Sequence, residues 1–69
     1  MIHCRLKAIL DQRGESIRKV SEAIEYRFES VRKLYNNTAP FYHRDLLDKL
    51  CTYLGVEIGE LLEVVKEEI

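Results

Sequence analysis

The sequence has few of the features that mark secreted, membrane-bound or metal-dependent proteins. Its 69 residues include one proline, three glycines and two cysteines. No apolar run approaches the ~20 residues that a membrane-spanning helix needs, and no leading apolar segment of the signal-peptide type is present. We therefore expect a cytoplasmic protein that does not interact with membranes.

The two cysteines, Cys4 and Cys51, are too few for a disulfide framework. Neither belongs to the paired C-x₂₋₄-C spacing of structural zinc sites, and His3 and His43 do not complete such a cluster. Both cysteines fall in apolar segments, which predicts buried free thiols. We expect no metal and no cofactor.

The net charge of −1 is low for a nucleic-acid-binding protein, which usually has a basic balance. The charge is distributed unevenly, however. Residues 1–50 carry ten basic and seven acidic side chains, whereas residues 51–69 carry one basic and five acidic ones. This asymmetry predicts a molecule with a positive side and a negative side, and it does not exclude DNA as a partner.

Apolar residues recur every three or four positions along the chain, which predicts five short helices and no strand. Gly14, Asn36-Asn37 and Gly55 follow three of these stripes as helix stops. No linker, repeat or low-complexity segment interrupts residues 1–69, so we expect one compact all-α domain. The five stripes are Ile2, Leu6, Ile9 and Leu10; Ile17, Val20, Ser21 and Ile24; Val31, Leu34 and Tyr35; Leu46, Leu47, Leu50, Cys51 and Leu54; and Ile58, Leu61, Leu62 and Val65.

Residues 16–37 form the most informative segment, because two short helices joined by a three- to four-residue turn are typical of a helix-turn-helix. Ser16 can cap the first helix, and the small Ser21 suits a close approach of the two helices. Tyr26 can fill the turn. The solvent side of the second helix is then predicted to present Phe28, Glu29, Arg32 and Lys33.

These residues, with Leu47-x-x-Leu50-Cys51-x-x-Leu54-Gly55-Val56 and Glu60-Leu61-Leu62, resemble the phage-repressor/Cro-like (XRE-type) helix-turn-helix regulators. The resemblance is to short single-domain members and covers nearly the whole chain. It implies a five-helix lambda-repressor-like DNA-binding domain with a recognition helix at about residues 28–36 in the DNA major groove. The implied function is that of a sequence-specific double-stranded DNA-binding transcriptional regulator, a repressor that binds a palindromic operator as a homodimer.

The resemblance also implies which residues contact DNA, and side-chain chemistry supports some of these roles. Arginine and lysine can donate to guanine O6 and N7, glutamate can accept from cytosine N4, and a phenyl ring can pack on a thymine methyl. A solvated helix face is the alternative for the basic residues, and a favourable interaction with the helix dipole is the alternative for Glu29. The implied DNA-contacting residues are Ser16, Arg18, Arg27, Phe28, Glu29, Ser30, Arg32, Lys33 and Asn36.

Three residues depart from the family pattern. Glu25 occupies a turn position where the family has glycine with a positive φ, which predicts strain or a different turn. Arg27 replaces the usual Ser, Thr or Asp cap, so a helix-start amide loses its partner. Phe28 is a large apolar group on a face that should be wet.

One alternative function follows from these departures and from the acidic end of the chain. Phe28 with Tyr26, Phe41 and Tyr42 could form an apolar patch for a protein partner, so the same fold could serve as an antirepressor or antitoxin-like modulator of another regulator. An enzyme is not expected, because the sequence has no Gly-rich phosphate loop and no nucleophile motif.

Within the last stripe, Ile58, Leu61, Leu62 and Val65 are expected to complete the core, which leaves Val64 and Ile69 for a dimer contact.

Overall fold

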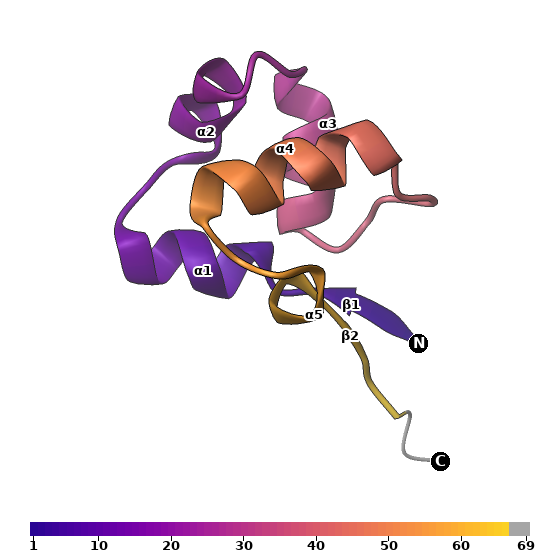
Figure 1. The fold of residues 1–69 in the computed structure, drawn as a ribbon. Coiled ribbons are helices and arrows are strands. Elements are labelled where there is room, and N and C mark those ends of the chain that lie inside the picture. Colours follow the sequence, from indigo (N-terminus) through magenta and orange to yellow (C-terminus); the bar gives the residue numbers. More distant parts are fainter. Residues whose placement is uncertain (67–69) are drawn as a thin grey trace.

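The computed structural model describes residues 1–66, which form five helices flanked by two short strands (Figure 1). Helices α1 to α4 enclose the centre of the molecule, while α5 and the strands lie at the end that carries both termini (Figure 1). In chain order the elements are β1 (Ile2–Cys4), α1 (Leu6–Arg13), α2 (Ile17–Ala23), α3 (Phe28–Tyr35), α4 (Arg44–Leu54), α5 (Ile58–Leu61) and β2 (Leu62–Val64).

The prediction of an all-helical chain is wrong at its two ends, which pair as an antiparallel two-stranded sheet. Ile2 lies opposite Val64, and Cys4 lies opposite Leu62. Apolar residues two apart at each end fit a strand as well as a helix, so periodicity over three residues cannot distinguish the two. Pairing between the chain ends decides, because each end supplies backbone hydrogen bonds that the other needs.

The fifth predicted stripe is only partly helical. Helix α5 ends at Leu61, which is fully buried, and Leu62 in β2 packs partly buried against the core. Ile58 is 51% exposed and Val65 is 39% exposed, so the prediction that these two residues complete the core is wrong. For Val65 the reason is the change from helix to strand at Leu62, which replaces the 3.6-residue period by one of two.

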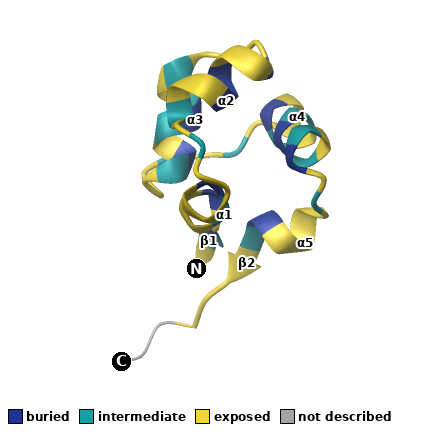
Figure 2. Cartoon of the chain, turned by 90° about the vertical axis from the view of Figure 1, so that its left-hand side faces the viewer, coloured by how far each residue is buried: buried dark blue, intermediate teal, exposed yellow. Residues whose placement is uncertain are grey.

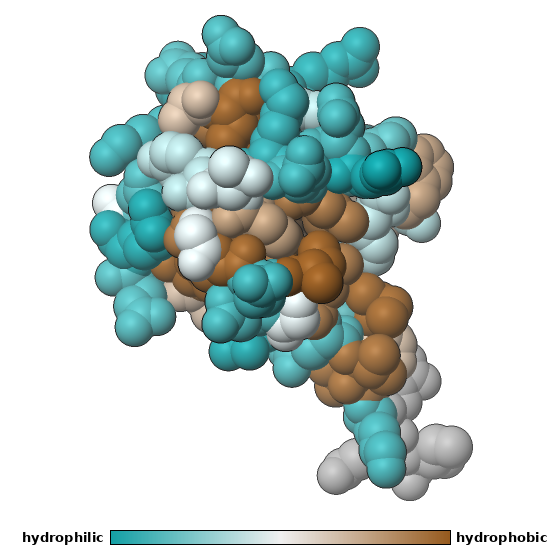
Figure 3. Space-filling model, in the orientation of Figure 1, coloured by the Kyte–Doolittle hydropathy of each residue, from teal (hydrophilic) through white to brown (hydrophobic). Residues whose placement is uncertain are grey.

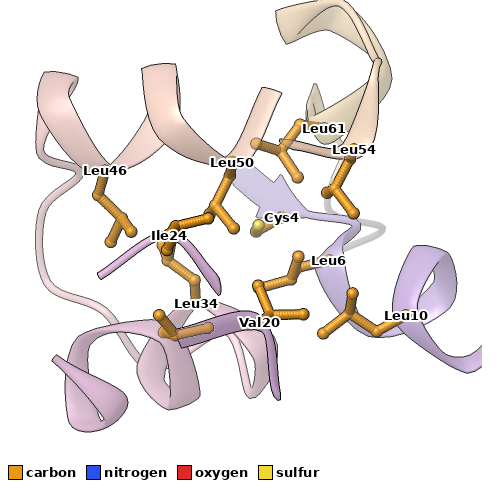
Figure 4. Close-up of a cluster of buried hydrophobic side chains, with 11 residues drawn as sticks. Cys4, Leu6, Leu10, Val20, Ile24, Leu34, Leu46, Leu50, Leu54 and Leu61 are labelled. Carbon is orange, nitrogen blue, oxygen red and sulfur yellow. The ribbon is translucent and has the colours of Figure 1, made fainter. Parts of the chain in front are cut away.

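The core consists of aliphatic side chains from the five helices and of Cys4 from β1, which converge at the centre of the molecule (Figure 4). Figure 2 marks the buried residues along the chain. Each predicted helical stripe contributes to it, and the buried face of α4 carries every fourth residue from Leu46 to Leu54. The buried apolar residues are Cys4, Leu6, Leu10, Val20, Ile24, Val31, Leu34, Leu46, Leu50, Leu54 and Leu61.

Helices α1 and α4 end at the predicted glycines. Gly14 and Gly55 have φ of 69° and 68°, and the residue after each donates its N–H back to a helix carbonyl, as in a Schellman motif. Helix α3 ends in the same way at Asn37, whose φ is 58°. Thr38 N–H bonds to Lys33 C=O at 2.9 Å. The second asparagine of the Asn36-Asn37 pair is therefore the one that adopts the left-handed conformation.

Both cysteines are free thiols, as predicted. Cys4 is buried, which raises the pKa of its thiol, whereas Cys51 is only partly buried. Within residues 1–66, no three Cys, His, Asp or Glu side chains gather as a metal site would require. Over the same residues, no helix has the length and apolar character to cross a membrane.

Candidate functional site

Helices α2 and α3 pack against each other to form the predicted helix-turn-helix. Ser16 caps α2, because its hydroxyl accepts a hydrogen bond from the N–H of Lys19 at 3.1 Å. Ser21 is buried and donates its hydroxyl to the C=O of Arg18 at 2.9 Å. A small residue therefore occupies the inner face of α2, as predicted for helices that approach closely.

The turn between the helices has the predicted positive φ at Glu25, at 55°. Tyr26 N–H bonds to Ser21 C=O at 2.9 Å, and Glu25 N–H bonds to Glu22 C=O at 3.2 Å. This is the hydrogen-bond pattern of a Schellman motif, in which Glu25 takes the position that glycine favours. Tyr26 is half-buried against the core and fills the turn, so the turn has the positive φ that the sequence resemblance implied, although the residue is not glycine.

Helix α3 begins at Phe28 after Arg27, whose side chain makes no capping hydrogen bond. The absence of a side-chain cap agrees with the prediction from the residue type. Val31 and Leu34 are fully or almost fully buried and hold α3 in place. The opposite face of α3 is therefore turned outwards, and it carries Glu29 and Lys33 in exposed positions.

Glu29 and Arg32 form an ion pair one turn apart on this outward face. Arg32 Nε donates to Glu29 Oε1, and Nη2 of the same guanidinium lies against that oxygen. The side chain of Glu29 is 57% exposed and that of Arg32 is 43% exposed. An exposed pair of this kind contributes about 0.3–0.5 kcal/mol, whereas one good bidentate base contact contributes about 1–3 kcal/mol. The pair is therefore weak and costs little free energy to open.

Phe28 is half-buried, because the guanidinium of Arg18 lies over its ring at 4.8 Å from the centroid. This cation–π contact joins the start of α2 to the start of α3. The exposed apolar group expected at this position is thus partly covered, and Arg18 is held beside α3.

The remaining predicted residues are Ser30, in the first turn of α3, and Asn36, at its C-terminal end. Ser30 is half-buried and, with Lys33, lines a shallow hollow closed by the loop residues Pro40 and Phe41. Asn36 is exposed at the end of the helix, with φ of −89°. All nine predicted DNA-contacting residues therefore belong to α2, α3 or the residues that adjoin these helices.

Comparison with known families identifies this arrangement. Residues 5–67 match the sequence model of the Cro/C1-type HTH DNA-binding domain. The chain belongs to this family. A search of curated proteins and a search of solved structures each gave no match.

The acidic part of this Cro/C1-type domain lies away from its helix-turn-helix. Glu57 precedes α5 as its cap, Glu60 lies in α5 and Glu63 lies in β2, and α5 and β2 are at the end of the molecule remote from α2 (Figure 1). The charge asymmetry in the sequence thus places acidic residues away from α2, although Arg5 pairs with Glu63 beside the sheet.

The predicted aromatic patch is not assembled in the Cro/C1-type domain. Tyr26 and Tyr42 pack against the core, and Phe28 is covered by Arg18. Phe41 is exposed at 63%, and its ring meets His43 edge-on. The sequence indicated that these four side chains could form one apolar patch. The patch is not formed, because Tyr26 and Tyr42 pack against the core.

Two residues that sequence reasoning missed hold the C-terminal end of α3. Tyr35 donates its hydroxyl to Asp11 at 2.8 Å, and Asn37 bonds to the backbone of Cys4 through its side-chain amide. Their partners lie 24 and 33 residues away, so no local pattern indicated these contacts. For Asn37, the sequence signalled only a helix stop.

Of the two predicted dimer residues, Val64 lies in β2 and is 74% exposed. Ile69 lies outside the described residues. An exposed valine on a strand is compatible with a contact surface.

Proposed function

We propose that this Cro/C1-type domain is a sequence-specific double-stranded DNA-binding transcriptional regulator that represses its target. Recognition helix α3 enters the major groove and reads base edges. The single observation that carries the proposal is the outward face of α3, on which donors and an acceptor for base edges stand on a helix anchored by Val31 and Leu34. The proposed role is binding without catalysis, and the proposed location is the cytoplasm.

Each predicted contact residue has a proposed role that suits its position. Lys33 is exposed and makes no ion pair within residues 1–66, so it is free to donate to guanine. Glu29 and Arg32 read a cytosine and a guanine after their exposed ion pair opens. Ser16, Arg18, Arg27 and Asn36 contact phosphates and set the register of α3 on the duplex. Phe28 packs on a thymine methyl, and Ser30 contributes a hydroxyl near the same groove.

The proposal includes a homodimer on a palindromic operator, with half-sites about one helical turn (~34 Å) apart. The exposed Val64 and the outer edge of β2 support a second copy at the end of the domain remote from α2. Dimerisation doubles the contact area on DNA, which offsets the modest positive charge of one α3 face.

The test is selection of a duplex from a random pool, followed by fluorescence anisotropy across a salt series. Binding should weaken as salt rises, because phosphate neutralisation releases counterions. Lys33→Ala should weaken binding by roughly 5–150-fold and relax specificity at one base pair, as loss of about 1–3 kcal/mol predicts. Arg18→Ala should weaken binding to all sequences about equally and lower the salt slope by about one.

The matched control is Lys66→Ala, which removes one exposed cation at the far end of the molecule. It should leave operator affinity unchanged. The proposal fails if no duplex is enriched at low salt, or if Lys66→Ala weakens binding as much as Lys33→Ala does.

A second candidate function is a protein-interaction module that modulates another regulator. The observation that favours it is the low free charge of the α3 face, where Glu29 engages Arg32 and Phe28 engages Arg18. Under this alternative the selected pool shows no enrichment, and Phe28→Ala abolishes capture of a protein partner. An enriched duplex with the expected effects of Lys33→Ala would reject it.

A further inference from the structure

The side-chain amide of Asn37 is held in one orientation by the backbone of β1. Its Oδ1 accepts from Cys4 N–H at 2.6 Å, and its Nδ2 donates to Cys4 C=O at 2.9 Å. A flipped amide would set Nδ2 against that N–H and Oδ1 against that C=O, so both hydrogen bonds would be lost. Asn37 therefore presents a donor, and not an acceptor, to the group beside it.

That group is the imidazole of His3, whose Nε2 lies 3.2 Å from Asn37 Nδ2. An amide nitrogen can only donate, so a hydrogen bond forms here only if Nε2 carries no proton. The neutral ring then has its proton on Nδ1, which is buried and lies 3.4 Å from Glu63 Oε2. The contact thus requires neutral His3 in its Nδ1–H form.

Protonation of His3 would reverse the hydrogen-bond polarity at Nε2. The imidazolium carries a proton on both ring nitrogens, so two donors would meet where one hydrogen bond now lies. The Asn37 amide cannot turn to accept without losing both bonds to Cys4. The His3 side chain is 41% exposed, so the ring can turn towards solvent, and it then no longer holds Asn37.

Charged groups of both signs surround His3. Glu63 favours the charged ring, but Arg5 Nε shares the same carboxylate oxygen at 3.9 Å. Lys7 and Asp11 pair with each other at 2.9 Å. Two cations and two anions cancel, so the main change on protonation is the lost hydrogen bond at Nε2. The titratable groups from the elements packed here are Glu63 of β2, Arg5 before α1, Lys7 and Asp11 of α1, and Tyr35 of α3, which donates to Asp11.

The contact with His3 continues into the last turn of α3 through Asn37. Asn37 N–H bonds to Leu34 C=O at 3.2 Å, and Thr38 N–H bonds to Lys33 C=O at 2.9 Å. Lys33 reads a base in the proposed function, and Asn36 contacts a phosphate. A displaced Asn37 therefore disturbs the turn that carries two proposed DNA contacts.

We propose that His3 is a positioning residue for α3: the neutral ring holds the Asn37 amide on Cys4, and protonation releases it and weakens operator binding. The effect on binding rests on the function proposed above. Imidazole is the side chain that gains a proton between about pH 8 and 5, so α3 is held near neutral pH and loosened in acid. DNA affinity is thereby coupled to pH through a residue outside the helix-turn-helix.

The first test is nuclear magnetic resonance of the DNA-free protein in a His43→Gln background, where His3 is the sole histidine. Ring ¹⁵N shifts should place the proton of the neutral form on Nδ1. The hydrogen-exchange protection factor of the Cys4 amide should fall by roughly 2–12-fold from about pH 7.5 to 5.5, the factor that corresponds to one net hydrogen bond. A neutral ring with its proton on Nε2, or constant protection while the ring protonates, overturns the proposal.

Two substitutions imitate the two forms of His3. His3→Gln keeps an acceptor that does not titrate, so Cys4 protection should stay high at both pH values. His3→Lys presents only donors, so its Cys4 protection should match acidified wild type at both. Both variants keep a polar side chain, because apolar side chains are already exposed at this end of the molecule (Figure 3). A wild-type pH response in His3→Gln would assign the effect to another group and reject the proposal.

Asn37→Asp tests the polarity of the contact directly. A carboxylate oxygen replaces Nδ2, so the protonated ring can donate to it, whereas the neutral Nδ1–H ring cannot. Cys4 protection should then rise from about pH 7.5 to 5.5, and a variant that merely weakens the fold would lower it at both. Asn36→Asp is the matched control, because it adds the same charge one residue away and should keep the wild-type fall. A fall of wild-type size in Asn37→Asp rejects the proposal.

Fluorescence anisotropy with the selected operator tests the consequence for binding. In the His43→Gln background, acidification should weaken binding by roughly 2–12-fold more when residue 3 is His than when it is Gln. Equal losses, with Cys4 protection falling as expected, reject the positioning role. If no duplex is enriched, the proposed function fails instead, and the exchange measurements alone decide whether neutral His3 holds Asn37.

Discussion

Replacing Glu25 by glycine should stabilise the domain, although the change removes a side chain and adds no contact. Glu25 has φ of 55°, a conformation in which an ordinary residue is destabilised by roughly 1–2 kcal/mol and glycine is not. Glycine loses about 0.5–1 kcal/mol more backbone entropy on folding. The difference is a gain of about 0.5–1 kcal/mol in the free energy of unfolding. Since 1 kcal/mol shifts the Tm of a 60–100-residue domain by roughly 4–8 °C, we expect Tm to rise by about 2–8 °C.

Thermal and urea denaturation followed by circular dichroism measure this effect, and two further variants isolate its cause. Glu25→Ala removes the same side chain but keeps a non-glycine residue at the strained position, so it should have nearly the wild-type Tm. Gly14→Ala is the reverse experiment, because it places a non-glycine residue at a φ of 69°. No heavy atom lies within 4 Å of the added Cβ, so the change introduces no steric clash. It should lower the free energy of unfolding by about 1 kcal/mol through backbone strain alone.

The reasoning is refuted if Glu25→Gly leaves Tm unchanged or lowers it while Gly14→Ala lowers Tm as expected. That result would mean that the exposed Glu25 side chain makes a stabilising interaction that outweighs its backbone strain. An equal rise for Glu25→Ala and Glu25→Gly would assign the gain to removal of the charge rather than to φ.

Two further predictions concern helix capping and the acid range. Arg27→Ser should raise the free energy of unfolding by about 0.5–1 kcal/mol, because the backbone at this position is already extended as in a helix cap. The same change should weaken DNA binding, because it removes a phosphate contact. A lower Tm for Arg27→Ser would contradict the capping argument. Hydrogen bonds from Tyr53 and Arg13 lower the pKa of the Glu15 carboxyl, so its stabilisation is present near neutral pH and is lost as pH falls through the lowered pKa. We expect Glu15→Gln to lower stability at pH 7 in urea melts. The difference from wild type should shrink as pH falls through the ordinary glutamate range, about pH 4.3, and should vanish only below the lowered pKa of Glu15. A constant difference at all pH values would argue against the linkage.

Much of the helical fold follows from local patterns in the sequence. The spacing of leucines from Leu46 to Leu54 predicts the buried face of α4, because side chains four apart share one face of a helix. Gly14 and Gly55 predict helix ends, because glycine adopts a positive φ without strain. The pattern failed at Ile2 and at Leu62, where three residues are too few to distinguish a helix from a strand.

The candidate site was predictable in its residues but not in its contacts. The uncapped start of α3 at Arg27 followed from residue type, whereas the sequence left open whether Glu25 would be strained or the turn would change, and its φ of 55° shows the strained alternative. The stacking of Arg18 on Phe28 and the burial of Tyr42 did not, because both depend on which elements meet in space. The expected aromatic patch was wrong for this reason.

By itself, the sequence determined the helices, their stops, the helix-turn-helix and the separation of charge along the chain. These features depend on interactions among near neighbours, and such interactions have fixed periods and residue preferences. Only the tertiary structure decided that Ile2–Cys4 and Leu62–Val64 form a sheet and that Asn37 occupies one edge of it. A strand is completed by hydrogen bonds to a partner 60 residues away, and no local pattern specifies which distant backbone will satisfy them.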